Sequence, residues 1–303
     1  IYHQGEVMSG SKINPDHWFI EVHEEAKVLA GFEIEGKALY SKPSDFQKVE
    51  IYQTKNHGKL LAHDDKIMVT EKDEFVYHDM IVHVPMFTHP KPKHVLVIGG
   101  GDGGTVREVL RHPSVETCTM VEIDGDVVEA CKEWIPKTSS ELTNPKVSLK
   151  IQDGVEFVKN SQQKFDVILV DSSDPIGPAT PLFNVDFYKD INKILSDDGI
   201  VVSQAESPFY EMNMQKALVK IKAQVFDKLH LYNYINMSYP GCLWSFSFAS
   251  RGLCPFKDFD PGRVTGEFQY YNPQIHWGAF MLPEFQKKAH GDALTPTPTP
   301  FWK

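Results

Sequence analysis

The sequence has few cysteines, no long apolar run and no excess of positive charge, and each shortage excludes a class of protein. Its four cysteines among 303 residues have no C-x-x-C spacing, which favours reduced, structural thiols and a cytoplasmic protein. No apolar run approaches the ~18 residues of a membrane span, and no segment has the pattern of a secretory signal, so we expect no membrane partner. The net charge of −10 lacks the basic face that a nucleic-acid partner requires.

Two kinds of sequence pattern divide the chain near residue 84. From His17 to about Lys72, short alternating runs between turn residues predict a small antiparallel sheet, and Glu74–His83 has helical spacing. Beyond the Pro-rich connector at 89–93, strands and helices alternate, which predicts an α/β domain with a mostly parallel sheet. The expected units are an N-terminal β domain (1–84), a catalytic α/β domain (85–290) and a low-complexity tail (291–303), whose end at 295–303 is expected to be disordered.

The predicted strands of the α/β domain end in polar side chains. These strands are expected at 94–98, 118–124, 147–154, 165–175 and 199–206. In open α/β sheets the ligand lies beyond the carboxyl ends of the strands. One crevice is therefore expected to receive the side chains that follow them: Asp102, Glu122, Asp153, Asp171 and Gln204. Residues 229–282 return to β-like runs and predict an antiparallel pair at the sheet edge.

The stretch His94–His112 predicts a strand, a glycine turn and a helix. Gly99, Gly101 and Gly104 match G-x-G-x-x-G, where glycine permits close backbone approach and the helix N-terminus offers free N–H groups. Asp102 inside this turn would repel the pyrophosphate of a dinucleotide. The turn instead favours a ligand with a cationic end, such as a sulfonium nucleoside derived from S-adenosylmethionine.

Two further strand ends suggest nucleoside contacts. Glu122 lies 23 positions after Gly99, where an acid normally accepts hydrogen bonds from ribose hydroxyls. The alternative is a solvated acid at a strand end. The pair Asp153-Gly154 predicts either a plain turn or an adenine contact.

The loop that begins at Asp171 carries a second acid, Asp174. Two nearby carboxylates are costly unless a cation joins them. A metal is one candidate, but clustered histidine ligands are lacking and a diamine fits better; an acidic surface loop is the plain alternative. The prolines and glycine between 172 and 184 predict a segment without helix or strand that closes over the site as a lid. Histidines at 57, 63, 83, 89 and 112 are interpreted as surface or packing residues.

Five separated motifs, in consistent order from about Trp18 to Phe285, resemble those of the spermidine synthase family, aminopropyltransferases of polyamine biosynthesis. They are TEKDEFVYHD at 70–79, GGGDGG at 99–104, VEID at 121–124, DSSDPIGPA at 171–179 and YYNPQIHWGAFMLPEF at 270–285. The resemblance implies a small β domain before a Rossmann-like, methyltransferase-type domain, and a homodimer or homotetramer. It implies decarboxylated S-adenosylmethionine as co-substrate, with neither a prosthetic group nor a metal.

The resemblance also implies roles for individual residues. Together with the glycine turn, the donor-binding positions are Gln47, His78, Gly99, Gly101, Asp102, Glu122, Ile123, Asp153, Gly154 and Pro178. The positions around the acceptor amine, expected to be putrescine, are Tyr77, Asp171, Asp174, Gln204 and Tyr239. Asp171 is expected to accept or relay the proton of the amine, and Tyr77 to orient the nitrogen.

Several positions depart from the family pattern. His63-Asp64-Asp65 replaces a Leu-Asp-Gly turn, Asp79 a Glu, Met68 a Gln and Ala205 a Gly. These departures leave undecided which amine is the acceptor: putrescine, agmatine, cadaverine or a longer triamine. The rivals are a putrescine N-methyltransferase that uses S-adenosylmethionine, and a nicotinamide dehydrogenase, which would not explain Asp102. A non-enzymatic polyamine-binding protein is disfavoured because both loop acids and Tyr77 are present.

Overall fold

The N-terminal part of the chain forms two small antiparallel sheets. A computed structural model describes residues 14–24, 26–173 and 177–298. The first sheet pairs β1 (Trp18–His23) with β2 (Val28–Glu33). The second has the order β3-β4-β5-β6, with these bounds: β3 Tyr40–Pro43, β4 Lys48–Gln53, β5 Lys59–His63 and β6 Lys66–Thr70. The predicted antiparallel β domain is therefore present, divided into two sheets.

The turn between β5 and β6 shows how the local sequence sets this sheet. Asp64 and Asp65 both have positive φ, 47° and 63°. Such values suit the two-residue hairpin turns whose twist matches that of antiparallel strands, and Asp is one of the residues that tolerates them. The Asp64 carboxylate accepts a hydrogen bond from the Lys48 backbone N–H (2.8 Å), which ties the turn to β4.

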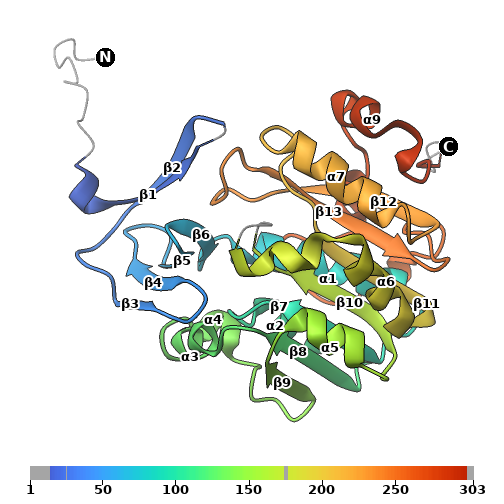
Figure 1. Cartoon of the computed structure of the whole chain (residues 1–303), viewed down its shortest axis with the longest axis horizontal. Coiled ribbons are helices and arrows are strands. Elements are labelled where there is room, and N and C mark those ends of the chain that lie inside the picture. Colours follow the sequence, from blue (N-terminus) through green and yellow to red (C-terminus); the bar gives the residue numbers. More distant parts are fainter. Residues whose placement is uncertain (1–13, 25, 174–176, 299–303) are drawn as a thin grey trace.

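A larger, mostly parallel sheet forms the second part of the chain (Figure 1). Within the described residues it has seven strands in the order β12-β13-β11-β10-β7-β8-β9. The strands are β7 His94–Gly99, β8 Thr117–Glu122, β9 Val147–Ile151, β10 Phe165–Asp171, β11 Leu195–Gln204, β12 Lys228–Ile235 and β13 Leu243–Ser250. Among these described strands, β13 runs opposite to the other six and is antiparallel to both β11 and β12. The chain therefore has the expected α/β fold, with the antiparallel pair at its edge.

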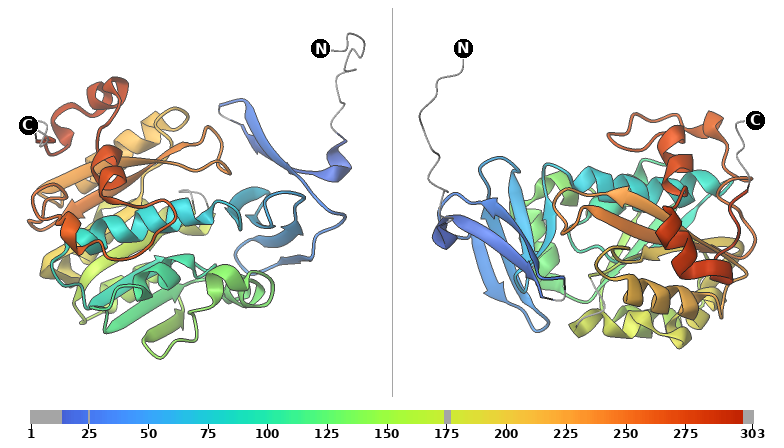
Figure 2. Two further views of the ribbon diagram at one scale, coloured as in Figure 1. Left: turned by 180° about the vertical axis from the view of Figure 1, so that it is seen from behind. Right: turned by 90° about the horizontal axis from the view of Figure 1, so that it is seen from above.

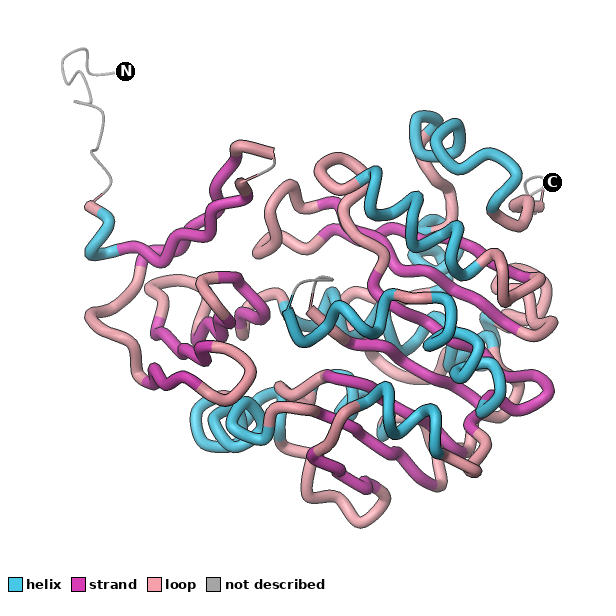
Figure 3. Tube along the Cα trace, viewed as in Figure 1, coloured by secondary structure: helices cyan, strands magenta, loops and turns pink. Residues whose placement is uncertain are grey.

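Alternate residues of the central strand β7 pack into two different layers. Val95 and Val97 join the core beneath α1 and α2, whereas Leu96 and Ile98 join the core beneath α5, α6 and α7. Helices on both faces exclude water from the sheet, which explains the continuous apolar runs of its strands (Figure 3).

The helices alternate with the strands along the chain. The α-helices are α1 Glu74–Thr88, α2 Gly104–Leu110, α3 Gly125–Trp134, α4 Pro136–Ser139, α5 Gly154–Asn160, α6 Val185–Ile194, α7 Met212–Lys222, α8 Pro273–Ala279 and α9 Glu284–His290. Short 3₁₀ turns lie at η1 Pro15–His17, η2 Gly177–Phe183, η3 Pro261–Arg263 and η4 Gly291–Ala293. Within the part of the chain that is described, none of the helices is both long and apolar enough to cross a membrane.

Helix α1 runs five residues past its predicted end at His83 and so continues through the expected domain boundary. Pro85 lies inside it, although proline removes a backbone donor from a helix. The helix is almost wholly buried, and the Arg263 guanidinium donates to the carbonyls of His89 and Pro90 just beyond its end (2.9 Å each). This contact comes from a residue far along the chain, which local sequence could not indicate.

Two other sequence-based expectations were wrong in part. The segment predicted to lack helix and strand contains η2, a 3₁₀ helix over Gly177–Phe183. The tail predicted to be disordered is ordered where it is described, because the Thr295 backbone N–H donates to the Leu229 carbonyl (2.7 Å). The Thr295 hydroxyl accepts from the Leu229 N–H in return (2.9 Å).

Candidate active site

The N-terminal strands lie beside the carboxyl ends of the large sheet (Figure 2). Residues of both parts line one cleft. The structure brings most of the candidate residues onto its walls. They are Gln47, Tyr77, His78, Gly99, Gly101, Asp102, Glu122, Ile123, Asp153, Gly154, Asp171, Gln204 and Tyr239. Asp174 lies outside the described residues, as does the side chain of Pro178. The lid prediction falls partly on the same undescribed segment.

The glycine turn is shaped by the side chains and backbone that pack against it. Gly99 has φ +83°, and a Cβ there would lie 2.0 Å from the Asp171 carbonyl oxygen. A Cβ on Gly104 would lie 2.2 Å from the ring of His78. The Gly100 N–H also donates to the Asp171 carbonyl (2.8 Å). Gly99 and Gly104 are therefore needed because the backbone of the turn lies close to Asp171 and His78, two residues that line the cleft.

Asp171, at the end of β10, is held by two short hydrogen bonds. The Tyr77 hydroxyl donates to its Oδ1 and the Thr105 hydroxyl to its Oδ2, both at 2.6 Å. Burial of the carboxyl raises the pKa of Asp171, and the charge of Asp102 raises it further. A carboxylate with a raised pKa is a better proton acceptor, provided that it stays ionised at the working pH.

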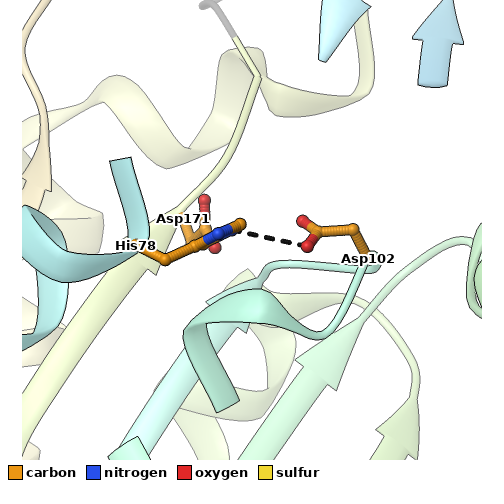
Figure 4. A group of neighbouring side chains, drawn as sticks. All are labelled: His78, Asp102 and Asp171. Carbon is orange, nitrogen blue, oxygen red and sulfur yellow. Dashed lines mark ion pairs between the residues drawn. The ribbon is translucent and has the colours of Figure 1, made fainter. Parts of the chain in front are cut away.

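His78 lies between the carboxylates of Glu74 and Asp102. Its Nδ1 is 2.6 Å from Glu74 Oε2. Its Nε2 is 3.4 Å from Asp102 Oδ1 (Figure 4). Burial alone would lower the pKa of His78, but Asp102 and Glu74 outweigh it and raise the pKa to about 10. The two carboxylates therefore favour the doubly protonated form of His78, which faces Asp102 of the glycine turn.

The nucleoside side of the cleft is formed by the ends of β8 and β9. Glu122 is 8% exposed and accepts a hydrogen bond from the Asp124 N–H (2.9 Å); burial raises its pKa to about 7. Gln47 donates to Asp124 Oδ2 (3.1 Å), so the N-terminal sheet is tied to this edge. Asp153 accepts from the Val155 N–H (2.7 Å) and caps α5, so the pair Asp153-Gly154 begins a helix rather than the plain turn that was one of its two interpretations.

Aromatic rings close the opposite side of the cleft. The Tyr77 ring packs against Phe246 and Tyr239, with centroids 5.1 and 6.2 Å away. The Tyr239 hydroxyl donates to the Met68 carbonyl (2.8 Å), and Trp244 lines the same wall. This wall is suited to the methylene chain of an amine, with Asp171 at its inner end.

Three residues near the cleft were missed by the sequence interpretation: Glu74, Thr105 and Arg107. Glu74 and His78 are four positions apart on a predicted helix, a spacing that places side chains together and could have been recognised. Thr105 is a hydroxyl in the first turn after the glycines. Arg107 offered no local signal, because its partner Glu74 comes from another helix. His63, interpreted as a surface or packing residue, also lines the cleft.

Comparison with known proteins gives consistent matches over most of the chain. The family model of the spermine/spermidine synthase domain matches residues 74–258, and that of the spermidine synthase tetramerisation domain matches residues 17–71. A polyamine aminopropyltransferase of Methanocaldococcus jannaschii is 45% identical over 285 residues, covering 91% of this chain and 96% of that protein. A protein of the same name from Alkaliphilus metalliredigens is 44% identical, covering 89% and 96%.

Solved structures agree with these sequence matches. A spermidine synthase in complex with the transition state analogue AdoDATO has a TM-score of 0.88 and 40% identity to this chain. The match covers 90% of this chain and 94% of that one. The spermidine synthase of Thermotoga maritima has a TM-score of 0.86, with the same identity and coverage.

Proposed function

The chain belongs to the spermine/spermidine synthase family of polyamine aminopropyltransferases, and we propose that it transfers an aminopropyl group from decarboxylated S-adenosylmethionine to putrescine. The products are spermidine and methylthioadenosine. The observation that carries this proposal is the placement of Asp102 and Asp171 in one cleft, beside Tyr77.

The donor is bound on the nucleoside side of the cleft. Glu122 accepts hydrogen bonds from the ribose hydroxyls, and Asp153 with Gly154 contacts the adenine. Asp102 holds the terminal ammonium of the donor. Gln47, His78, Gly99, Gly101, Ile123 and Pro178 complete the donor site.

The acceptor amine lies against the aromatic wall, with Tyr77, Gln204 and Tyr239 around it and Asp174 holding its distal ammonium. The amine nitrogen attacks the aminopropyl carbon bonded to sulfur, so a C–N bond forms and a C–S bond breaks. The C–S electron pair passes to sulfur, which leaves as a neutral thioether. Asp171 takes the proton that the nitrogen loses.

The protein's main task is to supply a neutral, aligned amine. A free alkylamine resembles lysine, with a pKa of about 10.4, and is almost wholly protonated at neutral pH. Alignment in the cleft contributes several of the ~7–11 kcal/mol that well-oriented reactions gain. The raised pKa of Asp171 supports its role as the acceptor of the proton.

The family match to a tetramerisation domain over residues 17–71 supports assembly as an oligomer, a homodimer or homotetramer. The residues it covers include β1 to β6. They also include Gln47, which lies between β3 and β4 and lines the cleft. Assembly and the active site therefore share the N-terminal domain.

Donor choice tests the proposal directly. S-adenosylmethionine carries an extra carboxylate, which would lie near Asp102, so we expect its kcat/KM to be at least about 10-fold lower than that of the decarboxylated donor. Purified protein is incubated with each donor and a panel of amines, and methylthioadenosine is quantified. Equal release of methylthioadenosine from both donors would contradict the donor choice proposed for Asp102. Formation of S-adenosylhomocysteine with a methylated amine would establish the N-methyltransferase instead. Preference for agmatine or cadaverine would correct the acceptor alone.

Asp102→Ala should strongly reduce use of the decarboxylated donor, because it removes the anion that holds the donor's ammonium. The loss of a charged hydrogen bond of about 1.5–3 kcal/mol corresponds to a roughly 10- to 100-fold higher KM for the donor. Methylthioadenosine has no ammonium and serves as the matched ligand. Its inhibition constant should stay near that of the parent protein; a parallel loss of methylthioadenosine affinity would instead indicate a collapsed turn.

A further inference from the structure

The two ring nitrogens of His78 face two different carboxylates. Nδ1 lies 2.6 Å from Glu74 Oε2, and Nε2 lies 3.4 Å from Asp102 Oδ1, with the side chain 1% exposed. A neutral imidazole has one N–H and one lone pair, so one of the two contacts would place a lone pair against an anion. Only the doubly protonated ring can donate toward both acids.

Glu74 is buried and is itself paired with cations from elsewhere in the fold. Arg107 Nη2 donates to its Oε2 (2.9 Å) and Arg107 Nη1 to its Oε1 (3.2 Å), and Lys137 Nζ lies 3.3 Å from Oε1. Burial would raise the pKa of Glu74, but His78 and Arg107 hold it well below the usual range. Arg107 is fixed in turn by Glu108 Oε1 (2.9 Å).

We propose that Glu74, held by Arg107, is a positioning residue that fixes His78 as a doubly protonated cation. The charge on His78 then keeps Asp171 ionised and ready for the proton of the amine. This role rests on the function proposed above.

The charged groups around His78 explain why a residue that keeps its ring protonated is needed. Asp102 faces it from the glycine turn, and Asp171 faces it from the end of β10. A ring nitrogen of His78 and one carboxylate oxygen of each acid lie within 4.8 Å of one another. On its own helix it faces Glu74, and the edge of the Tyr77 ring lies beside it. The charge of His78 lowers the pKa of Asp171, opposing burial and Asp102. Without that charge, more of Asp171 would be protonated at neutral pH.

Glu74→Gln keeps the shape of the side chain and removes its charge. In the parent protein, both His78 nitrogens should stay protonated from about pH 6 to about pH 9. In the variant, one of them should lose its proton within that range. For a rise of about one unit in the pKa of Asp171, the ratio of variant to parent kcat should fall toward about 0.1 at the acid end of the pH profile and return to 1 toward pH 9, where the carboxyl is ionised in both proteins.

The measurements are imidazole ¹⁵N spectra of the full-length protein and kcat as a function of pH. His78→Gln identifies the His78 signals among the 13 histidines. Arg107→Gln, which loosens Glu74, should move both readouts in the same direction. Glu50→Gln is the matched control: Glu50 is also buried and lies 2.9 Å from a lysine, Lys48, but it is not among the residues that line the cleft.

The spectra need no substrate, so this proposal and the proposed function can fail separately. A single N–H on His78 of the parent at neutral pH would overturn the proposal, even where Glu74→Gln does not fold. A loss of kcat by the same factor at every pH would also overturn it, since that is what a structural role alone produces. Absence of aminopropyl transfer by the parent would count against the proposed function only.

Discussion

Asp171→Asn is expected to lower kcat by roughly 10²–10⁴-fold, the range for a lost general base. The amide keeps the size of the carboxyl and can still bond Tyr77 and Thr105, but it cannot accept a proton. Steady-state kinetics with saturating donor and varied amine will separate kcat from KM. A group that acts in the transition state changes kcat, whereas one that only binds substrate raises KM.

Asp166→Asn provides the matched control for this prediction. Asp166 lies on the same strand as Asp171, near the opposite end, and its Oδ2 accepts from the backbone N–H groups of Lys93 and His94 (2.8 and 2.9 Å). The same substitution there should leave kcat near the parent value. If Asp171→Asn also keeps kcat and only raises the amine KM, Asp171 is an ammonium anchor. Holding an ammonium is the role proposed above for Asp174.

The central strand, turn and helix could be predicted because their signals are local. Apolar runs buried on both faces and the glycines that end them lie within about 20 residues of His94. The same holds for the acids at the strand ends, since parallel strands bring their carboxyl ends to one edge. Asp102, Glu122 and Asp171 could therefore be placed together from sequence.

Contacts between distant residues could not be predicted in the same way. The predicted helix ended at His83, but burial and the Arg263 guanidinium stabilise a longer one, α1. Thr295 is hydrogen-bonded to Leu229, 66 positions away, and this contact holds the start of the TPTPTP stretch against β12. Glu74 and Arg107 are 33 positions apart, and only the packing of α1 against α2 brings them together.

The glycine turn also shows a limit of motif interpretation. The pattern G-x-G-x-x-G was interpreted as room for a ligand, which is one reason for glycine. The structure adds another: Gly99 and Gly104 leave room for Asp171 and His78. The motif therefore positions the charged residues of the cleft as well as the ligand, and its substitution should affect catalysis and stability together.

Gly99→Ala is expected to destabilise the fold and to lower kcat by roughly 100-fold. The methyl group would lie 2.0 Å from the Asp171 carbonyl oxygen, a backbone atom that cannot move aside without displacing the carboxyl proposed to accept the proton. A 1 Å misplacement near the reacting groups costs on the order of 10²-fold in rate. Overpacking of this kind adds about 1–3 kcal/mol to the strain of alanine at positive φ, itself about 1–2 kcal/mol.

Gly36→Ala separates the two causes of this loss. Gly36 has nearly the same φ, +76° against +83° for Gly99, but among the described residues nothing lies within 4 Å of the Cβ it would gain. It should therefore show the backbone strain alone, with a loss of about 1–2 kcal/mol in the free energy of unfolding and an unchanged kcat. Chemical denaturation and steady-state kinetics of both variants give the comparison. Equal losses of stability with full activity in both would mean that the turn yields to the methyl group, and that Asp171 does not depend on the close approach of Gly99.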